Sequence, residues 1–396
     1  MSIINSILKK KKELFNTTVQ YDYACNVLNN DGIKYEEYGR HDDKYDIDAI
    51  FYTGYKNTKV FAYIGIPKNY DSNSKLPAVI CLHGGLGKAD IDWVEKWNDM
   101  GFIAIAPDLY GDGPEEDKTN PYNTGVKKHP YAGVFPWDEN GFLTDYENSG
   151  MYQNLVNVIY AHNLLESISS VDKKSVGIMG ISWGGVTSGI VSGIDDRLSF
   201  AVLVYGCGYL YECKTYFKRN ILAEDKTKEW DPAVFLANAK MPIMYINSDS
   251  DEHFSLNSTT HTYNKTKNGY LSILNKFIHT HEDGRDVDFA YDFAKNMVAE
   301  NNPYIKIAST KFIDDKLVVE FSLPQENEIK IIKAYYLEQE YKEYASSDEL
   351  NWKLANDYEV KANEIEVSFD TNITCCYVSV IDKFDAVIST PLINVL

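Results

Sequence analysis

Short apolar runs alternate with amphipathic segments from about residue 60 to residue 300. The runs stand at 60–66, 78–82, 102–106, 176–179, 200–204, 243–246 and 271–278. Between them, apolar side chains recur at helical spacing, most clearly from Tyr152 to Ile168. Continuous apolar strands that alternate with amphipathic helices predict the α/β class: a mostly parallel sheet with helices on both faces. A ligand of such a sheet is expected at the carboxyl ends of the strands.

The pattern changes after about residue 302. Short, often alternating runs at 316–321, 329–337, 364–369, 375–381 and 386–389 are separated by polar turns, which predicts a small antiparallel β-sandwich. We therefore divide the chain into a partly helical N-terminal extension (1–44), an α/β unit (45–301) and a C-terminal sandwich (302–396). The sandwich is expected to pack on the α/β unit or to mediate homo-oligomerisation, and sugar binding is the alternative.

One motif carries the strongest chemical signal. The apolar strand at 176–179 runs directly into Gly180-Ile-Ser182-Trp-Gly184, and a segment of small residues follows. A serine that attacks a carbonyl must protrude from a very sharp turn between strand and helix, and such a turn leaves no space for flanking side chains. The motif in this context predicts that Ser182 is a nucleophile.

An acid and a base are expected after the serine, in the chain order that this strand-turn-helix motif carries. The apolar run 243–246 ends in a polar stretch that contains Asp249 and Asp251. We expect Asp251 to be the acid, because a carboxylate a few residues past the strand can turn back toward a histidine. Asp249 remains the alternative, and both side chains would otherwise only solvate a turn.

The base is sought among the histidines that follow the acid. His253 stands too close in sequence to Asp251 to swing onto it, and His279 directly follows the predicted strand 271–278. His281 is placed in the loop beyond that strand, where a ring can meet the serine on one nitrogen and the acid on the other. We therefore expect His281 to be the base.

Two backbone N–H groups should stabilise the oxyanion that forms during attack on a carbonyl. The first is the amide of Trp183, directly after the nucleophile. The second is expected in the glycine-rich loop His83-Gly-Gly85-Leu86-Gly, which follows the run 78–82. Gly85 is the preferred donor and Leu86 the alternative. The loop lacks the spacing of a phosphate-binding loop.

With these stretches in place, the chain resembles the α/β-hydrolases, and more narrowly the acetyl-xylan-esterase-like and dienelactone-hydrolase-like branch related to the catalytic domains of prolyl oligopeptidases. The resemblance covers about residues 45–300 and rests on LPAVICLHGG, GFIAIAPDLYGDG, VGIMGISWGG and DPAVFLANAKMPIMYINSDSDEHFSLNS. It implies an acid at Asp251 and a base at the second histidine of an HxH motif, here His281. Dienelactone hydrolases proper use cysteine as nucleophile, so Ser182 points to the esterase side. Ser248 and Ser255 depart from the usual glycine and proline, which implies an acid loop of different shape.

A long aromatic-rich stretch at 111–150 lies between a predicted strand and a predicted helix. Loops of this length are usually functional, so we expect a lid over the active site, with Trp137 among the residues that contact substrate. Tyr205, at the end of another strand, and Leu86 are expected to line the same pocket.

Composition limits the partners. The formal net charge is −19, which disfavours nucleic acid and anionic membrane. The six cysteines show no repeated spacing, the N-terminus does not resemble a secretory signal, and no run is long enough to span a membrane, so a cytoplasmic location is expected. The histidines near Asp251 fit no common ligand spacing, so no metal or other cofactor is expected.

Together these features predict a serine hydrolase that cleaves small-molecule or carbohydrate esters, acetyl esters above all, through an acyl-enzyme. The alternatives are a serine peptidase of the prolyl oligopeptidase type and a non-catalytic protein that keeps the hydrolase fold.

Overall fold

A single large sheet forms the body of the protein. The computed structural model describes residues 2–30, 39–71, 73–111, 113, 145–213, 228–313, 316–342 and 349–395. The large sheet has ten strands in the order β1-β3-β4-β6-β5-β7-β8-β9-β10, with β2 paired to β3. Its strands are β1 (Tyr21–Tyr23), β2 (Arg40–His41), β3 (Asp46–Thr53), β4 (Lys59–Gly65), β5 (Leu76–Leu82), β6 (Ile103–Pro107), β7 (Val171–Ile181), β8 (Phe200–Val204), β9 (Ile243–Ser248) and β10 (Gly269–Leu274).

The sheet is antiparallel at its start and parallel from β6 to β10. The strands β3, β4 and β6 pair antiparallel, whereas β6, β5, β7, β8, β9 and β10 are joined by parallel ladders. The central strands β6, β8 and β9 are buried along their whole length, as expected for parallel strands covered on both faces. The predicted fold class is confirmed.

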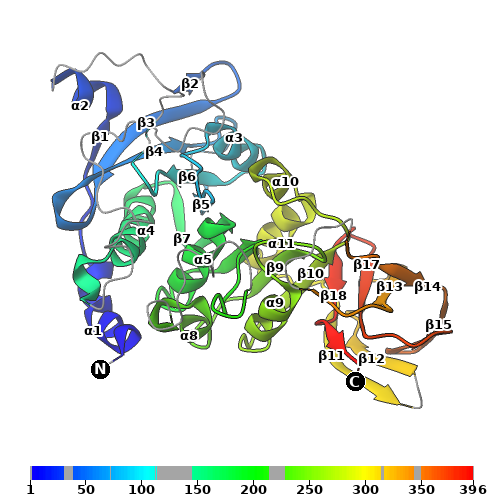
Figure 1. Ribbon diagram of the computed structural model, residues 1–396. Coiled ribbons are helices and arrows are strands. Elements are labelled where there is room, and N and C mark those ends of the chain that lie inside the picture. The colour runs from blue at the N-terminus through cyan, green and yellow to red at the C-terminus, as the bar shows by residue number, and fades with distance from the viewer. Residues whose placement is uncertain are drawn as a thin grey trace.

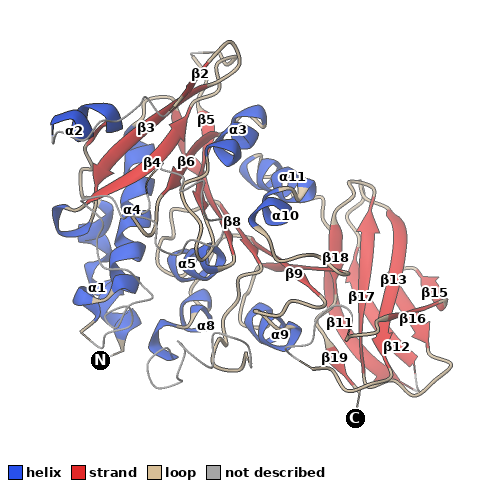
Figure 2. Ribbon diagram, turned by 45° about the horizontal axis from the view of Figure 1, so that its top comes forward, coloured by secondary structure: helices blue, strands red, loops and turns tan. Residues whose placement is uncertain are grey.

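Helices cover both faces of the sheet. They are α1 (Ile3–Phe15), α2 (Ala24–Asn30), α3 (Ile91–Asp99), α4 (Gly150–Ser167), α5 (Trp183–Ser192), α8 (Pro232–Leu236), α9 (Leu256–Tyr263), α10 (His281–Arg285) and α11 (Asp288–Val298). Figure 2 shows α3, α10 and α11 on one face and α4, α5, α8 and α9 on the other. The N-terminal α1 packs on α4, where the Asn163 side chain donates to the Leu14 carbonyl at 2.8 Å. Among the described residues, no helix combines the length and the apolar character that a membrane crossing requires.

The last part of the chain forms two separate antiparallel sheets, as the sequence predicts. One has the order β11-β12-β16-β15 and the other β14-β13-β17-β18, with β19 paired to β17. Their strands are β11 (Lys306–Ile313), β12 (Lys316–Ser322), β13 (Ile329–Leu337), β14 (Lys353–Ala355), β15 (Asp357–Lys361), β16 (Glu364–Ser368), β17 (Cys375–Asp382), β18 (Val387–Ser389) and β19 (Ile393–Asn394). Alternate residues of β12 and β16, two neighbouring strands of the first sheet, are buried, so this sheet has one apolar face.

These C-terminal sheets lie beside the β10 end of the large sheet, at the opposite end from α1 (Figure 1). We call residues 306–395 the C-terminal module. The backbone N–H of Ile273 in β10 donates to the Ser389 hydroxyl at 2.9 Å, and the Leu392 N–H donates to the Thr260 hydroxyl at 3.0 Å. Side chains therefore satisfy backbone groups where the module meets the outer edge of the large sheet.

Candidate active site

Ser182 occupies a strained turn between β7 and α5. Its φ of 56° and ψ of −116° lie outside the ordinary regions for a residue with a side chain. The turn leaves no space for side chains at its glycines. A Cβ added at Gly180 would lie 2.2 Å from the Gly184 carbonyl oxygen, and one added at Gly184 would lie 2.0 Å from the Leu82 carbonyl oxygen. Such strain persists only where the surroundings enforce it, and it is concentrated at functional sites.

This crowding predicts that Gly184→Ala destabilises the protein. The added methyl group meets backbone that cannot move away, so we expect unfolding free energy to fall by about 3 kcal/mol or more. Gly189→Ala, in the same helix, is the matched control: its Cβ would lie 3.2 Å from the nearest atom, a Pro232 side-chain carbon, and alanine favours helix. Urea unfolding of the two variants measures the difference, and equal stability would contradict the steric account.

A chain of hydrogen bonds connects Ser182 to a buried carboxylate through His279. The Nε2 atom of His279 lies 2.9 Å from the Ser182 Oγ, and its Nδ1 lies 2.8 Å from Oδ2 of Asp251. The other carboxylate oxygen of Asp251 accepts the backbone N–H groups of His253 at 2.7 Å and Phe254 at 2.8 Å. The Asp251 side chain is fully buried, whereas the His279 side chain keeps 20% of its surface exposed. A general base needs this combination of an oriented ring and an accessible nitrogen.

Aromatic rings hold the imidazole of His279 in place. The Tyr205 ring stacks on it at 4.4 Å between centroids with an interplanar angle of 24°, and Phe254 lies nearly parallel at 5.9 Å. The Tyr205 hydroxyl donates to the Ile278 carbonyl in the same loop. Tyr205 lies beside the site as expected, but it is fully buried. Its ring packs on the imidazole of His279, and its contact with substrate stays a prediction.

His281 does not stand where the sequence places it. Its Nε2 accepts the backbone N–H of Gly84 at 2.9 Å, and it is the first residue of α10. The expectation that His281 bridges Ser182 and Asp251 is wrong, because β10 ends at Leu274 rather than near residue 278. His279 is consequently a loop residue, free to reach both partners.

Two signals could have marked the correct histidine. In the sequence, the polar pair Asn275-Lys276 interrupts the apolar run. In the structure, Lys276 has a positive φ of 55°, just after the strand ends. Thr280, followed by acidic residues, is the N-cap of α10: its hydroxyl accepts the Asp283 N–H at 2.9 Å. A helix that starts at His281 leaves only His279 in the loop.

Asp249, the alternative acid, directly follows β9. Its side chain is buried, and it accepts the Lys276 N–H at 2.9 Å and the Tyr377 hydroxyl at 2.9 Å. It makes no contact with His279 among the described hydrogen bonds. The preference for Asp251 thus agrees with the geometry. Ser255, which replaces the usual proline, is the N-cap of α9.

The glycine-rich loop after β5 lies against the nucleophile. A Cβ at Gly84 would lie 3.0 Å from the Ser182 Cβ, and the Gly87 N–H donates to the Gly84 carbonyl at 3.1 Å. The Gly84 N–H already donates to His281. The next amide along the loop, which could donate to an oxyanion, is that of Gly85. Leu86 has a positive φ of 60° and is 75% exposed, and its contact with substrate stays a prediction. Trp183 begins α5, where the first N–H groups have no partner within the helix.

His83 braces this loop from inside the protein. Its Nδ1 donates to the Gly84 carbonyl at 2.9 Å and its Nε2 accepts the Leu109 N–H at 3.0 Å, which requires a neutral ring. Burial lowers the pKa of His83 from 6.5 to about 4, although Asp108 opposes the shift. Sequence reasoning gave His83 no role.

A pH dependence of stability follows from His83. The unfolded chain takes up a proton on this histidine below about pH 6.5, whereas the folded protein resists protonation down to about pH 4, so stability falls as pH falls through that window. Between pH 7.5 and pH 5 the loss should be about 2 kcal/mol. Urea unfolding at the two pH values checks this, with His83→Gln as the comparison. A variant whose stability changes with pH as much as that of the wild type would contradict the assignment.

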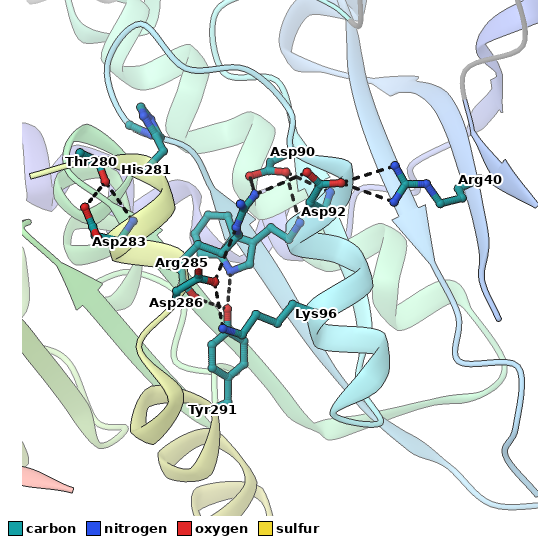
Figure 3. Close-up of polar contacts among 12 residues, drawn as sticks. Arg40, Asp90, Asp92, Lys96, Thr280, His281, Asp283, Arg285, Asp286 and Tyr291 are labelled. Carbon is teal, nitrogen blue, oxygen red and sulfur yellow. Dashed lines mark hydrogen bonds and ion pairs between the residues drawn. The ribbon is translucent and has the colours of Figure 1, made fainter. Parts of the chain in front are cut away.

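Ion pairs join the helix after the base loop to the helix after the glycine-rich loop (Figure 3). Arg285, at the end of α10, donates to the Asp90 carboxylate at 2.7 Å, and Asp90 is also the N-cap of α3. Lys96 of α3 pairs with Asp286 at 3.0 Å, and the Tyr291 hydroxyl donates to the Arg285 carbonyl at 2.7 Å. The ion pairs of Arg285 with Asp90 and of Lys96 with Asp286 therefore join α3 to the helix that follows the His279 loop.

Most of the predicted lid, including Trp137, lies outside the described residues. Tyr146, near its end, belongs to a short 3₁₀ turn (Tyr146–Asn148) and packs edge-on against Tyr152 of α4 at 5.1 Å.

Comparisons with known proteins show the family of the chain. The model of the dienelactone hydrolase family matches residues 60–274, which is more than half of the chain. The match ends before His279 and before the C-terminal module. Among solved structures, an acetyl xylan esterase from Paenibacillus sp. R4 has a TM-score of 0.55 at 17% identity and covers 75% of this chain and 94% of its own. Acetyl xylan esterase 1 from Thermoanaerobacterium sp. JW/SL YS485 has a TM-score of 0.54 at 16% identity, covering 76% and 98%. At these identities the likeness establishes the fold alone.

Curated relatives carry peptidase names. A protein described as probable dipeptidyl-peptidase 5 from Aspergillus terreus is 25% identical over 226 residues, 52% of this chain and 28% of the relative. Dipeptidyl-peptidase 5 from Aspergillus oryzae is 22% identical over 230 residues, with the same coverage of 52% and 28%. The chain therefore spans less than a third of the length of these relatives.

Proposed function

The chain belongs to the dienelactone hydrolase family, and from that premise we propose that it is a serine hydrolase of carboxylic esters. One observation carries the proposal: the hydrogen-bonded sequence of Ser182, His279 and Asp251, with 2.9 Å and 2.8 Å between the successive atoms. A hydroxyl, an imidazole and a buried carboxylate in this order are the constellation that activates a serine for acyl transfer.

The mechanism has two acyl-transfer steps. As the Ser182 Oγ attacks the ester carbonyl, its proton passes to Nε2 of His279, and the Asp251 carboxylate stabilises the resulting imidazolium. The amides of Trp183 and Gly85 would donate to the oxyanion of the tetrahedral intermediate. Collapse of that intermediate releases the alcohol, which takes the proton from His279. Water then attacks the acyl-enzyme by the same route and regenerates the Ser182 hydroxyl.

The acyl group is proposed to be small, with acetyl first and a carbohydrate as the alcohol. Two acetyl xylan esterases share the fold over most of their own length, which supports this order of testing. The second candidate is cleavage of short peptides, favoured by the dipeptidyl-peptidase names of the curated relatives. That candidate is weaker because the matched segment is only 28% of those proteins.

A substrate panel separates the two candidates. We expect faster turnover of p-nitrophenyl acetate and of acetylated xylo-oligosaccharides than of aminoacyl-proline amides, with Ser182→Ala as the blank for each. Higher kcat/KM on the amides would replace the esterase with a peptidase. A folded wild type that neither hydrolyses any member nor reacts with a fluorophosphonate would favour a non-catalytic protein.

A further inference from the structure

A buried carboxylate outside the serine-histidine-aspartate chain ties the acid loop to the base loop. Asp249 directly follows β9, two residues before Asp251. Its oxygens accept the backbone N–H of Lys276 at 2.9 Å and the side-chain amide of Asn275 at 2.5 Å, and its own N–H donates to the Leu274 carbonyl at 3.2 Å. Asn275 and Lys276 form the turn that leads from β10 to His279, and Lys276 has a positive φ of 55°. Asp249 thus joins the acid loop to a turn in which Lys276 has a backbone conformation that residues with side chains rarely adopt.

The C-terminal module contacts both the side chain and the backbone of Asp249. The Tyr377 hydroxyl of β17 donates to the Asp249 side chain at 2.9 Å, and the Trp352 indole N–H donates to the Asp249 carbonyl at 3.1 Å. Tyr377 is in turn fixed by rings, since Tyr335 stacks on it at 5.0 Å and Trp352 packs edge-on at 5.1 Å. All these donors point at one fully buried residue, where an unmet hydrogen bond is costly.

A further contact reaches the acid loop. The backbone N–H of Leu256, at the start of α9, donates to the Tyr341 hydroxyl of the module at 3.0 Å. Since α9 begins just after Asp251 and Phe254, the module braces the loop at both ends: at Asp249 before the acid and at Leu256 after it.

We propose that the C-terminal module is a working part of the active site: through Tyr377 and Trp352 it holds Asp249, and Asp249 positions the loops that carry Asp251 and His279. Tyr377, Trp352 and Asp249 are positioning residues, because none of them touches the Ser182 hydroxyl or the His279 ring. The inference rests on the proposed serine hydrolase function, and it assigns to the module a role other than independent sugar binding.

The test uses the full chain and two single-atom changes. Tyr377→Phe removes only the hydroxyl and keeps the rings stacked. Asp249→Asn replaces one carboxylate oxygen by an NH₂ group, which cannot accept the hydrogen bonds that the surrounding groups donate. Small displacements of reacting groups are expensive, so kcat for p-nitrophenyl acetate should fall about 10-fold in Tyr377→Phe and about 100-fold in Asp249→Asn, with KM changed less than about 2-fold. The rate of fluorophosphonate labelling should fall in parallel with kcat. Tyr336→Phe is the matched control, since Tyr336 lies in the adjacent strand and packs on Phe369 within the module.

The outcomes are distinguishable. If the wild type hydrolyses the ester and a folded Tyr377→Phe matches it in kcat, the positioning role is overturned while the proposed function stands. If the wild type neither labels nor turns over, the function fails and the inference with it. Should Tyr377→Phe not fold, Trp352→Phe replaces it: it removes the indole N–H but keeps an aromatic ring, and unchanged kcat there overturns the proposal equally.

Discussion

Replacing Ser182 by alanine should lower kcat/KM on acetyl esters by about 10³- to 10⁶-fold and leave the fold intact. The loss is large because the hydroxyl forms the covalent intermediate, so no other group in the site can substitute for it. Some residual rate above the uncatalysed reaction is expected, since oxyanion donors and binding still act in such variants. Steady-state kinetics with an active-site titration of the wild type measure the effect.

The matched control is Ser192→Ala, at the opposite end of the same helix. It removes a hydroxyl from a buried position without touching the strained turn at Ser182. Near wild-type turnover is expected there, and melting temperatures of the two variants should be similar. A Ser182→Ala protein that retains more than about a tenth of the wild-type activity would exclude acyl transfer through this residue.

Replacing His279 by alanine should cost about 10³-fold or more in kcat, whereas His281→Ala should cost no more than about 10-fold. His279 is the ring that meets both Ser182 and Asp251, and removal of a general base from such a unit disables the nucleophile. His281 only accepts the Gly84 N–H, so its loss loosens one side of the glycine-rich loop. Loss of hydration and the nearby His279 lower the pKa of His281, which keeps that acceptor neutral.

His281→Gln refines the comparison. Its side-chain oxygen can accept the Gly84 N–H, so it should recover part of the loss seen in His281→Ala. If instead His281→Ala were inactive and His279→Ala retained activity, His281 would be the base, as the sequence predicts. The hydrogen-bond geometry around His279 would then not describe the working enzyme.

Much of the fold could be predicted because apolar periodicity reports burial. Runs such as 200–204 and 243–246 coincide with β8 and β9, since a strand covered on both faces must be apolar throughout. Strands of the C-terminal module, such as β12 and β16, could be predicted for a related reason: alternation marks strands that are half buried. Edge strands with exposed residues, such as β15, left no such signal.

The site was harder to predict because catalysis depends on where a strand ends. Ser182 is fixed by its glycine neighbours, which the sequence displays directly. The choice between His279 and His281 depended on Phe277 and Ile278, which look in the sequence like the continuation of β10. In the structure β10 ends at Leu274, the Phe277 ring stacks on Tyr205, and the Ile278 carbonyl accepts the Tyr205 hydroxyl. Contacts from distant segments, such as Tyr377 to Asp249, have no local pattern and needed the tertiary structure.

The most direct test of the central claim is to trap the acyl-enzyme and locate it. The protein would be mixed with p-nitrophenyl acetate, quenched in acid within the first turnover, digested and analysed by mass spectrometry. We predict an acetyl group on the peptide that contains Ser182 in the wild type, and none on that peptide in His279→Ala under the same conditions. Ester turnover without an acetyl group on Ser182, or acetylation that proceeds equally without His279, would contradict the account.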